Sequence, residues 1–376
     1  MATFLFRLLA LHSNYEPVLF SLATWFRDPY SVRLAAPNSW RNGAQLAPGS
    51  WRGMPYQHVG AVAVEWEPQR FRPRKVLTRR LNEFDLVQVV AGTPAWAWVA
   101  NDLKPPVCLY VATTIREERT SLMANTGGWR RALYALTTRM NARQEPAALR
   151  RMSHVFALSR YTFERLQSHV PAGRLTLALP GINTDIFYPP AEYCAQGPIV
   201  SVGRFNDPRK NVRLLLAAYR QVRQTQPDAP RLWLIGDKPA PVDWTLAEQW
   251  GIAPFIDISV NLTPEELAPC YRQASLFVLP SNEEGLGIVI LEAMASGLPV
   301  ISTRCGGPET LVSEEVTGML TPPGDVGQLA DALLLLLQSP QRRWEMGQAG
   351  HTVAVGQYSL SAAGRRFLEV YHHLLT

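Results

Sequence analysis

The sequence contains few cysteines, and none of them forms a recognisable pair. Four occur in 376 residues, at Cys108, Cys194, Cys270 and Cys305, without a Cys-x-x-Cys spacing. This scatter indicates neither a disulfide framework nor a zinc site, and it is typical of a reducing compartment. We therefore expect a cytoplasmic protein.

Long hydrophobic runs are also missing. The apolar stretch Ala2–Leu11 is short, is interrupted by Arg7, and lacks both the length of a membrane span and the cleavage pattern of a secretion signal. We interpret Thr3–Leu11 as a buried first strand, His12–Glu16 as its loop and Val18–Phe26 as the helix that follows. No Asp-x-Asp pair occurs, so the sequence offers no metal-ligand motif of that type.

Positive charge is concentrated in the first half of the chain. Residues 1–195 carry 23 Lys and Arg against 13 Asp and Glu, whereas residues 196–376 carry 14 against 18. The densest basic run, Arg70–Lys75 with Arg79 and Arg80, is a candidate for peripheral contact with the anionic inner face of a membrane or with a phosphorylated acceptor. A well-solvated basic face would explain the same charges. The run lacks a recognition-helix pattern, so we expect no nucleic acid partner.

One stretch, Ser275–Ser302, combines the strongest local signals. Its apolar run Leu276–Leu279 predicts a buried parallel strand. A turn-rich loop with Gly285 and Gly287 then leads into a helix pattern over Ile288–Ser296, followed by a second apolar strand. Such a unit directs backbone N–H groups and the positive end of a helix toward an anion such as a phosphate.

Two carboxylates accompany this unit. Glu284 lies in the loop beside the glycines, and Glu292 lies in the helix, about 7–8 Å further along its axis than Gly287. One carboxylate is suited to a sugar and the other to a ribose, with a diphosphate between them. Alternatively, Glu283 and Glu284 only complement the positive helix end and Glu292 faces solvent.

The pattern Pro280-Ser-Asn-Glu-Glu-Gly-Leu-Gly, followed by Leu291-Glu-Ala-Met-Ala-Ser-Gly-Leu-Pro-Val, resembles the Glu-x7-Glu signature of retaining glycosyltransferases with the GT-B fold, the glycosyl transferases group 1 or family 4 enzymes. The resemblance is tight over Pro198–Gln338 and loose before it. It implies an α/β protein with two Rossmann-like, doubly wound parallel-sheet domains facing across a cleft. The implied parts are an acceptor-binding domain over residues 1–190, a donor-binding domain over 197–356, and a last helix near 359–375 that packs back on the first domain.

A second segment of the C-terminal half also resembles that family. Pro198–Asn211 predicts a strand, then a loop that contains Gly203, Arg204, Arg209 and Lys210, then the start of a helix. Two cations in such a loop suit a diphosphate. The spacing resembles the family's donor-diphosphate element, with Arg204 and Lys210 as the matching cations; alone, the segment would be an ordinary solvated turn.

The resemblance implies roles for these residues. Glu284 would contact the sugar of a nucleotide-diphosphate sugar and Glu292 its ribose, while the cations and the helix N–H groups stabilise charge on the leaving diphosphate. The implied donor-binding set is Gly203, Arg204, Lys210, Glu284, Gly285, Leu286, Gly287, Ile288 and Glu292, with Glu284, Arg204 and Lys210 as the catalytic candidates. The implied reaction is retaining and requires neither a metal nor another cofactor.

Candidate acceptor residues follow the predicted strands of the first half. The apolar runs Asp85–Val90 and Val107–Ala112 are followed by loops with Gly92 and with Thr113 and Thr114, and ligands bind beyond the carboxyl ends of strands in open α/β sheets. Many relatives carry a Gly-Gly loop after the first strand and a histidine near the reaction centre. Here the first loop reads His12-Ser-Asn-Tyr, which makes His12 a further acceptor-side candidate, although a lone loop histidine is more often structural.

The sequence thus predicts a glycosyltransferase that moves a sugar from a nucleotide sugar to a hydroxyl acceptor. Two alternatives remain open. A non-catalytic nucleotide-sugar-binding subunit would explain why the first-half loops depart from the family pattern. A GT-B-fold epimerase or phosphorylase is the other, although no motif for the pyridoxal-bearing lysine of phosphorylases stands out.

Overall fold

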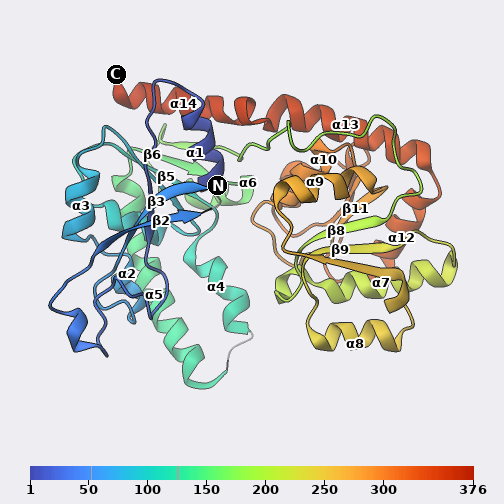
Figure 1. Cartoon of the computed structure of the whole chain (residues 1–376), viewed down its shortest axis with the longest axis horizontal. Helices are drawn as coiled ribbons and strands as arrows, with labels where there is room; N and C mark the ends of the chain where they lie inside the picture. Colours follow the sequence, from blue (N-terminus) through green and yellow to red (C-terminus); the bar gives the residue numbers. More distant parts are fainter. Residues whose placement is uncertain (52, 125–126) are drawn as a thin grey trace. The chain divides into compact units, whose positions relative to one another are not determined.

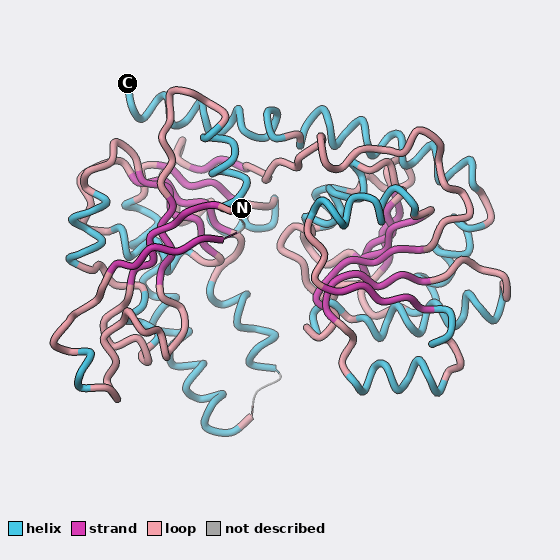
Figure 2. The backbone as a smooth tube through the Cα atoms, in the orientation of Figure 1, coloured by secondary structure: helices cyan, strands magenta, loops and turns pink. Residues whose placement is uncertain are grey.

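The structure, a computed structural model, describes residues 1–51, 53–124 and 127–376 and contains two compact units (Figures 1 and 2). The first unit comprises Met1–Leu179 and Gly364–Thr376, and the second comprises Pro180–Ala363. Across the described ranges, every helix is either too short or too polar to traverse a lipid bilayer.

The first unit is built on a four-stranded parallel sheet with the order β4-β5-β6-β7. Every residue of β5 is buried, as expected for an inner parallel strand. A separate sheet, β1-β3-β2, pairs β1 with β3 in parallel and β2 with β3 antiparallel. The strands are β1 (Leu19–Leu22), β2 (Leu46–Trp51), β3 (Met54–Val59), β4 (Val87–Ala91), β5 (Val107–Val111), β6 (His154–Ala157) and β7 (Leu175–Leu177). The helical segments are α1 (Ala2–Ala10), η1 (Pro37–Ser39), α2 (Glu67–Arg70), α3 (Lys75–Leu81), η2 (Pro94–Ala100), α4 (Ile115–Ala124), α5 (Gly128–Arg151) and α6 (Arg160–Leu166).

The second unit contains a six-stranded parallel sheet with the order β10-β9-β8-β11-β12-β13. The chain adds β9 and β10 on one side of β8 and β11 to β13 on the other, which confirms the predicted doubly wound arrangement. The strands are β8 (Ile199–Arg204), β9 (Leu232–Asp237), β10 (Ile256–Val260), β11 (Leu276–Leu279), β12 (Val300–Thr303) and β13 (Gly318–Thr321). The helical segments are η3 (Pro208–Lys210), α7 (Val212–Thr225), α8 (Pro241–Gln249), η4 (Ala253–Phe255), α9 (Pro264–Gln273), α10 (Ile288–Ala295), α11 (Pro308–Leu311), α12 (Val326–Leu337), α13 (Pro340–Tyr358) and α14 (Leu360–Leu375), the last of which continues into the first unit.

Strand order places a ligand site in the second unit. The direction in which strands are added reverses between the neighbouring strands β8 and β11. In open α/β sheets, ligands bind beyond the carboxyl ends of strands at such a reversal. The loops after β8 and β11 are the two segments that the sequence singles out for the donor.

Two predicted elements of the first unit are wrong. Thr3–Leu11, predicted as a strand, forms the helix α1, and Val18–Phe26, predicted as a helix, contains the strand β1. Phe4 and Leu8 of α1 are buried, and the Phe4 ring meets the Phe367 ring edge-on with 5.7 Å between centroids. A short apolar run fits either a helix or a strand, so contacts with α14 near the other end of the chain decide between them.

The last helix contributes to the core of the first unit. Phe367 and Tyr371 of α14 are almost fully buried. The Phe367 ring lies 4.4 Å from that of Phe156 in β6 and 5.1 Å from that of Tyr110 in β5, between centroids. These aromatic contacts explain why Gly364–Thr376 belong to the first unit.

Residues 180–196 pack on the second unit, although the sequence places the domain boundary at residues 190–197. The N–H of Ile182 donates to the carbonyl of Tyr358 over 2.7 Å, and the hydroxyl of Tyr193 donates to the carbonyl of Ser275 over 2.6 Å. The second compact unit therefore begins at Pro180.

A buried arginine fixes this entering segment. Arg343 of α13 donates from Nε to the hydroxyl of Tyr193 over 2.9 Å and from Nη2 to the carbonyl of Ala195 over 2.6 Å. Its Nη1 donates to the carbonyls of Leu336 and Leu337, in the last turn of α12, over 2.7 and 2.8 Å. Because the last carbonyls of a helix lack helical partners, the guanidinium caps α12 and ties it to the entering segment.

We expect Arg343→Ala to lower the free energy of unfolding by about 3 kcal/mol, because several buried acceptors lose a charged donor. Urea unfolding measures this change. The adjacent Arg342, which forms an exposed ion pair with Glu315, supplies the matched control, and Arg342→Ala should cost less than about 1 kcal/mol. Equal losses in the two variants would contradict the role given to Arg343.

Candidate functional site

The central stretch forms the predicted strand–loop–helix–strand unit. β11 is followed by a loop, by α10 and by β12. Gly287 is the N-cap of α10 and has a φ of +80°, a left-handed conformation that glycine adopts without strain. This N-cap supplies no side-chain hydrogen bond, and the first turn of α10 carries no acidic residue. Its N–H groups and positive end therefore suit an anion.

Two of the predicted catalytic residues contact each other. Lys210 ends η3, and its Nζ forms an ion pair with Oε1 of Glu284 in the loop before α10. The two side chains are 16 % and 10 % exposed, respectively. The hydroxyl of Ser281 donates to the same Glu284 oxygen over 3.1 Å. The loops after β8 and β11 thus bring a cation, a carboxylate and a hydroxyl into one partly buried cluster.

Arg204 has a different partner. It ends β8, its side chain is 64 % exposed, and its Nη2 lies 3.2 Å from Oδ2 of Asp207. Asp207 also accepts hydrogen bonds from Nε and Nη2 of Arg209 over 3.1 and 2.7 Å, and these bonds hold the pKa of Asp207 below its usual value. Asp207 therefore stays charged and orders both arginines. Sequence reasoning missed it, although a carboxylate three residues after a candidate arginine is a usable signal.

Glu292 is held by a buried tyrosine. Its Oε2 accepts a hydrogen bond from the hydroxyl of Tyr271 in α9 over 3.0 Å. Tyr271 is fully buried, and burial raises the pKa of its hydroxyl well above the usual value, so it remains a donor. The structure thus pairs Glu292 with Tyr271 and Glu284 with Lys210.

The other predicted donor residues differ in exposure. Leu286 is buried, whereas Ile288 is partly exposed at the start of α10. Around Gly285 no atom lies within 4 Å of the place where a Cβ would be, and near Gly203 only contacts of ordinary length occur. Gly285 and Ile288 are therefore the accessible members of this group.

Backbone contacts with two glycines hold the loop that carries Glu284. Glu284 pairs with Gly306 as an isolated parallel bridge, and the N–H of Gly307 donates to the Glu284 carbonyl over 2.9 Å. A Cβ at Gly307 would lie 2.6 Å from the Cα of Leu286 and 2.8 Å from the Glu284 carbonyl oxygen. Only glycine permits this approach, so the position of Glu284 depends on Gly307.

Two of the predicted acceptor-side loops adjoin in the first unit. The N–H of Thr113, after β5, donates to the carbonyl of Gly92, after β4, over 2.9 Å. The hydroxyls of Thr113 and Thr114 donate to Oε2 of Glu117 over 2.8 and 3.1 Å. Burial opposes charge on Glu117, but these bonds and one from Tyr161 outweigh it, and the pKa of Glu117 lies below its usual value. Sequence reasoning missed Glu117, for which composition and spacing gave no signal.

His12 does not lie where the sequence places it. It sits in an exposed turn after α1, because the segment before it is a helix and not a strand. The structural reason for expecting His12 at the carboxyl end of a strand was therefore wrong.

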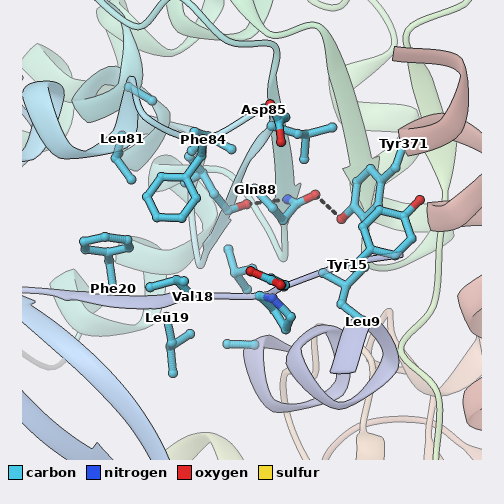
Figure 3. A pocket seen from close by; sticks show the side chains of 18 of the residues that line it. Leu9, Tyr15, Val18, Leu19, Phe20, Leu81, Phe84, Asp85, Gln88 and Tyr371 are labelled. Carbon is cyan, nitrogen blue, oxygen red and sulfur yellow. Dashed lines mark hydrogen bonds between the residues drawn. The ribbon is translucent and has the colours of Figure 1, made fainter. Parts of the chain in front are cut away.

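A cavity of about 940 Å³ lies within the first unit (Figure 3). It runs between β1 and β4, each the edge strand of its sheet, and its lining is largely apolar. On its wall, the hydroxyl of Tyr371 donates to Oε1 of Gln88 over 2.6 Å. Gly92 is the only one of the predicted site residues that lines it. The cavity is thus separate from the residues predicted for the donor.

A buried carboxylate joins the starts of two helical segments in the first unit. Glu145 of α5 accepts a hydrogen bond from the N–H of Ile115, the first residue of α4, over 3.0 Å, and another from the backbone of Ala95 in η2. Burial raises the pKa of Glu145 to about 7, and the backbone donors only partly offset that effect. Because η2 and α4 directly follow the loops with Gly92 and Thr114, Glu145 helps to position both loops.

We expect Glu145 to make the protein less stable as the pH rises from about 4.5 to about 7. The folded state keeps the proton up to about pH 7, whereas the unfolded chain releases it above about 4.5, so this contribution to stability is present at low pH and lost over that interval. Relative to wild type, Glu145→Gln should gain up to about 3 kcal/mol across it. Chemical unfolding at several pH values measures the difference, with the exposed Glu164→Gln as a control. A difference that does not vary with pH would contradict this assignment.

Comparison with known proteins relates these residues to a family. Residues 197–339 match the family described as glycosyl transferases group 1. The chain is 31 % identical over 245 residues to the GDP-mannose-dependent alpha-(1-6)-phosphatidylinositol monomannoside mannosyltransferase of Mycolicibacterium smegmatis, with 59 % of this chain and 64 % of that protein covered. It is 30 % identical to a D-inositol 3-phosphate glycosyltransferase of Segniliparus rotundus, with 54 % and 47 % covered. The chain thus spans about half to two thirds of the length of these relatives.

Solved structures share the fold over most of the chain. Sucrose-phosphate synthase from Thermosynechococcus elongatus superposes with a TM-score of 0.71 and 22 % identity, covering 99 % of this chain and 92 % of that one. The Anabaena protein HepE in complex with UDP superposes with a TM-score of 0.65 and 18 % identity, covering 79 % and 81 %. Both likenesses concern the fold, which is that of the GT-B glycosyltransferases. Residues 197–339 of the chain thus resemble the glycosyl transferases group 1 family.

Proposed function

We propose that this chain is a retaining, metal-independent glycosyltransferase that moves a sugar from a nucleotide-diphosphate sugar to a hydroxyl acceptor. The names of the relatives support the class of reaction, since they include two kinds of glycosyltransferase. The observation that carries the proposal is the cluster of Lys210 and Glu284 beside the uncapped start of α10.

A diphosphate fits this cluster by charge. Lys210 and Glu284 neutralise each other, and a diphosphate offers Lys210 a more strongly anionic partner. The exposed Arg204 supplies a second cation, and the N–H groups that begin α10 supply neutral donors. As the bond between the anomeric carbon and the diphosphate oxygen breaks, these groups stabilise the charge that develops on the leaving group.

Once a diphosphate replaces Glu284 as the partner of Lys210, Glu284 can act as a ligand for the sugar. Its carboxylate, next to the hydroxyl of Ser281, becomes free to accept hydrogen bonds from sugar hydroxyls. Glu292, oriented by Tyr271, is the matching candidate for the ribose. The acceptor oxygen forms the new bond to the anomeric carbon, and its proton leaves on the diphosphate. This division gives each carboxylate a binding role, unlike the acid–base pair of a glycosidase.

The first unit is the candidate for acceptor binding. Its loops with Gly92 and Thr113 adjoin and present Glu117, whose carboxylate can accept hydrogen bonds from a polyol. Two relatives are named for inositol-containing acceptors, phosphatidylinositol monomannoside and inositol 3-phosphate. We therefore propose a hydroxyl-rich acceptor for this chain.

The proposal predicts which variants lose donor binding. One of UDP-, GDP-, ADP- or dTDP-sugars should raise the melting temperature of the wild type and be slowly hydrolysed, with or without EDTA. Lys210→Met and Arg204→Ala should each weaken binding at least about tenfold, because each removes a charged hydrogen bond to the diphosphate. Glu284→Gln should retain nucleotide binding and lose turnover. Isothermal calorimetry and product analysis give the two readouts.

Arg213→Ala is the matched control for Arg204→Ala, since Arg213 is also an exposed arginine paired with an aspartate, Asp243, over 2.8 Å. Donor binding without turnover in any acceptor mixture would favour a non-catalytic subunit. Release of a sugar phosphate or of an epimerised donor would favour a phosphorylase or an epimerase. Binding of no nucleotide sugar would overturn the assignment of the cluster.

Gly307→Ala should weaken donor binding, although Gly307 is not itself a residue of the cluster. The added methyl group would meet the backbone of Leu286 and Glu284 and displace the loop, so we expect a loss of about tenfold or more. Gly356→Ala, at a helical position with open space around it, is the control and should leave binding unchanged. Wild-type affinity in Gly307→Ala would show that the loop position does not matter.

A further inference from the structure

Helix α5 exposes three large apolar residues of its first turns to solvent. Trp129, Leu133 and Leu136 are 72 %, 39 % and 52 % exposed. They are spaced i, i+4 and i+7, so on a helix that turns about 100° per residue they form a single line. These three residues are named here the apolar stripe of α5, which Figure 1 shows as a helix of the first unit.

The buried face of α5 is polar over its middle turns. Thr137, Thr138, Asn141 and Glu145 are buried there, and only the last turns contribute the apolar core residues Ala148 and Leu149. Asn141 and Glu145 lie about 120–160° around the helix axis from Trp129. A surface helix normally turns its apolar side to the core and its polar side to water, and the first part of α5 does the reverse. Within the described ranges, the apolar stripe is therefore not part of the buried core of the first unit.

Arginines flank the apolar stripe. Arg139 and Arg143 are exposed and lie about 80° and 40° around the axis from Trp129, and the guanidinium of Arg130 lies over the Trp129 ring at 5.6 Å from its centroid. The one acidic residue of α5, Glu145, is buried on the other face. The exposed side of the helix thus combines apolar side chains with arginines and carries no acidic residue of its own, although Glu65, Glu67 and Glu118 line a hollow beside Leu133.

We propose that this side of α5 docks on an anionic lipid bilayer, with the apolar stripe in the interfacial region and the flanking arginines on lipid phosphates. Large apolar side chains with arginines on their margins are typical of helices that lie in a membrane interface, where tryptophan is favoured. A second copy of the chain fits less well, because pairing two such faces would bring their arginines together. The inference is independent of the proposed glycosyl transfer.

The basic run that the sequence singled out is less suited to this contact. Arg70 donates from Nε to the carbonyl of Val64 and from Nη1 to that of Thr24, each over 2.7 Å. Arg74 is buried and donates to the carbonyl of Arg70 over 2.6 Å. Two of the cations of that run are therefore engaged within the first unit, whereas the arginines beside the apolar stripe are exposed.

Vesicle binding tests the proposal. The purified chain is mixed with phosphatidylcholine vesicles that contain about one third phosphatidylglycerol, and bound protein is measured by flotation. The wild type should bind, and it should bind much less to phosphatidylcholine alone or at high salt. The triple variant Trp129→Ser, Leu133→Ser, Leu136→Ser should lose at least about tenfold in partitioning. Arg139→Ala with Arg143→Ala should lose about thirtyfold, since each arginine near an anionic surface contributes about a factor of five.

Trp344→Ser and Arg365→Ala change exposed residues elsewhere and should bind as wild type does. Unchanged melting temperatures in all variants would show that these substitutions leave the fold intact. Wild-type binding by the apolar-stripe variant would overturn the proposal. The proposal would also be overturned if the wild type were a dimer that does not bind vesicles and the apolar-stripe variant were a monomer, because the stripe would then cover a second copy. The affinity for the nucleotide sugar, measured on the same variants, should equal that of the wild type. This result is expected whether or not the chain binds vesicles, so the two proposals are tested separately.

Discussion

The ion pair between Lys210 and Glu284 is the interaction on which the candidate donor site depends. Its two residues are far apart in the sequence and meet because β8 and β11 are neighbours in the second-unit sheet, with Ile199 opposite Leu276. Parallel neighbours end at the same edge, so the loops that follow them converge. The pair is mostly buried, where charges interact more strongly than in water, and each charge makes the burial of the other tolerable. A ligand that enters here must replace this interaction with a better one, which favours an anion of high charge density over a neutral sugar.

The residues around the pair explain how a site of this kind stays in place. Gly307 allows close backbone approach to the loop with Glu284, Tyr271 orients Glu292, and Asp207 orders the arginines at the end of β8. None of these supports touches the expected ligand in the proposed mechanism. They act by restricting the positions of groups that do, which lowers the entropy cost of binding. In the first unit, Glu145 has the same relation to the loops with Gly92 and Thr114, at the expense of a carboxyl group whose pKa is raised to about 7.

The second unit could be predicted from its sequence largely because its inner strands are short apolar runs bounded by glycine or proline residues. The runs that begin at Leu276 and Val300 become β11 and β12, and Lys210 and Glu284, both assigned to the donor by the resemblance, lie in contact. In the first unit, the predictions for Thr3–Leu11 and Val18–Phe26 were wrong, because an apolar run fits both a helix and a strand. A contact with Phe367 near the end of the chain favours the helix over the first stretch, and pairing with β3 fixes the strand in the second; no local pattern contains either contact. Glu117 and Glu145 were missed for a related reason. Each acts through hydrogen bonds to particular backbone or side-chain groups, and such partners cannot be read from spacing.

The two surfaces proposed to meet anions differ in how they hold charge. Lys210 is 16 % exposed and lies in a cluster with Glu284 and the start of α10, so salt screens it weakly and geometry decides what it binds. The arginines beside Trp129 are exposed and have freedom to move, so they suit a surface with many equivalent phosphates rather than a single ligand. The excess of positive charge in residues 1–195 therefore does not reflect the donor site, whose cations lie in the acidic half of the chain. It is better explained by α5, whose exposed side carries arginines without acidic neighbours on the same helix. Under the proposed membrane contact, electrostatic attraction and burial of apolar area favour the same partner at α5, which distinguishes these arginines from the other basic residues of the first half.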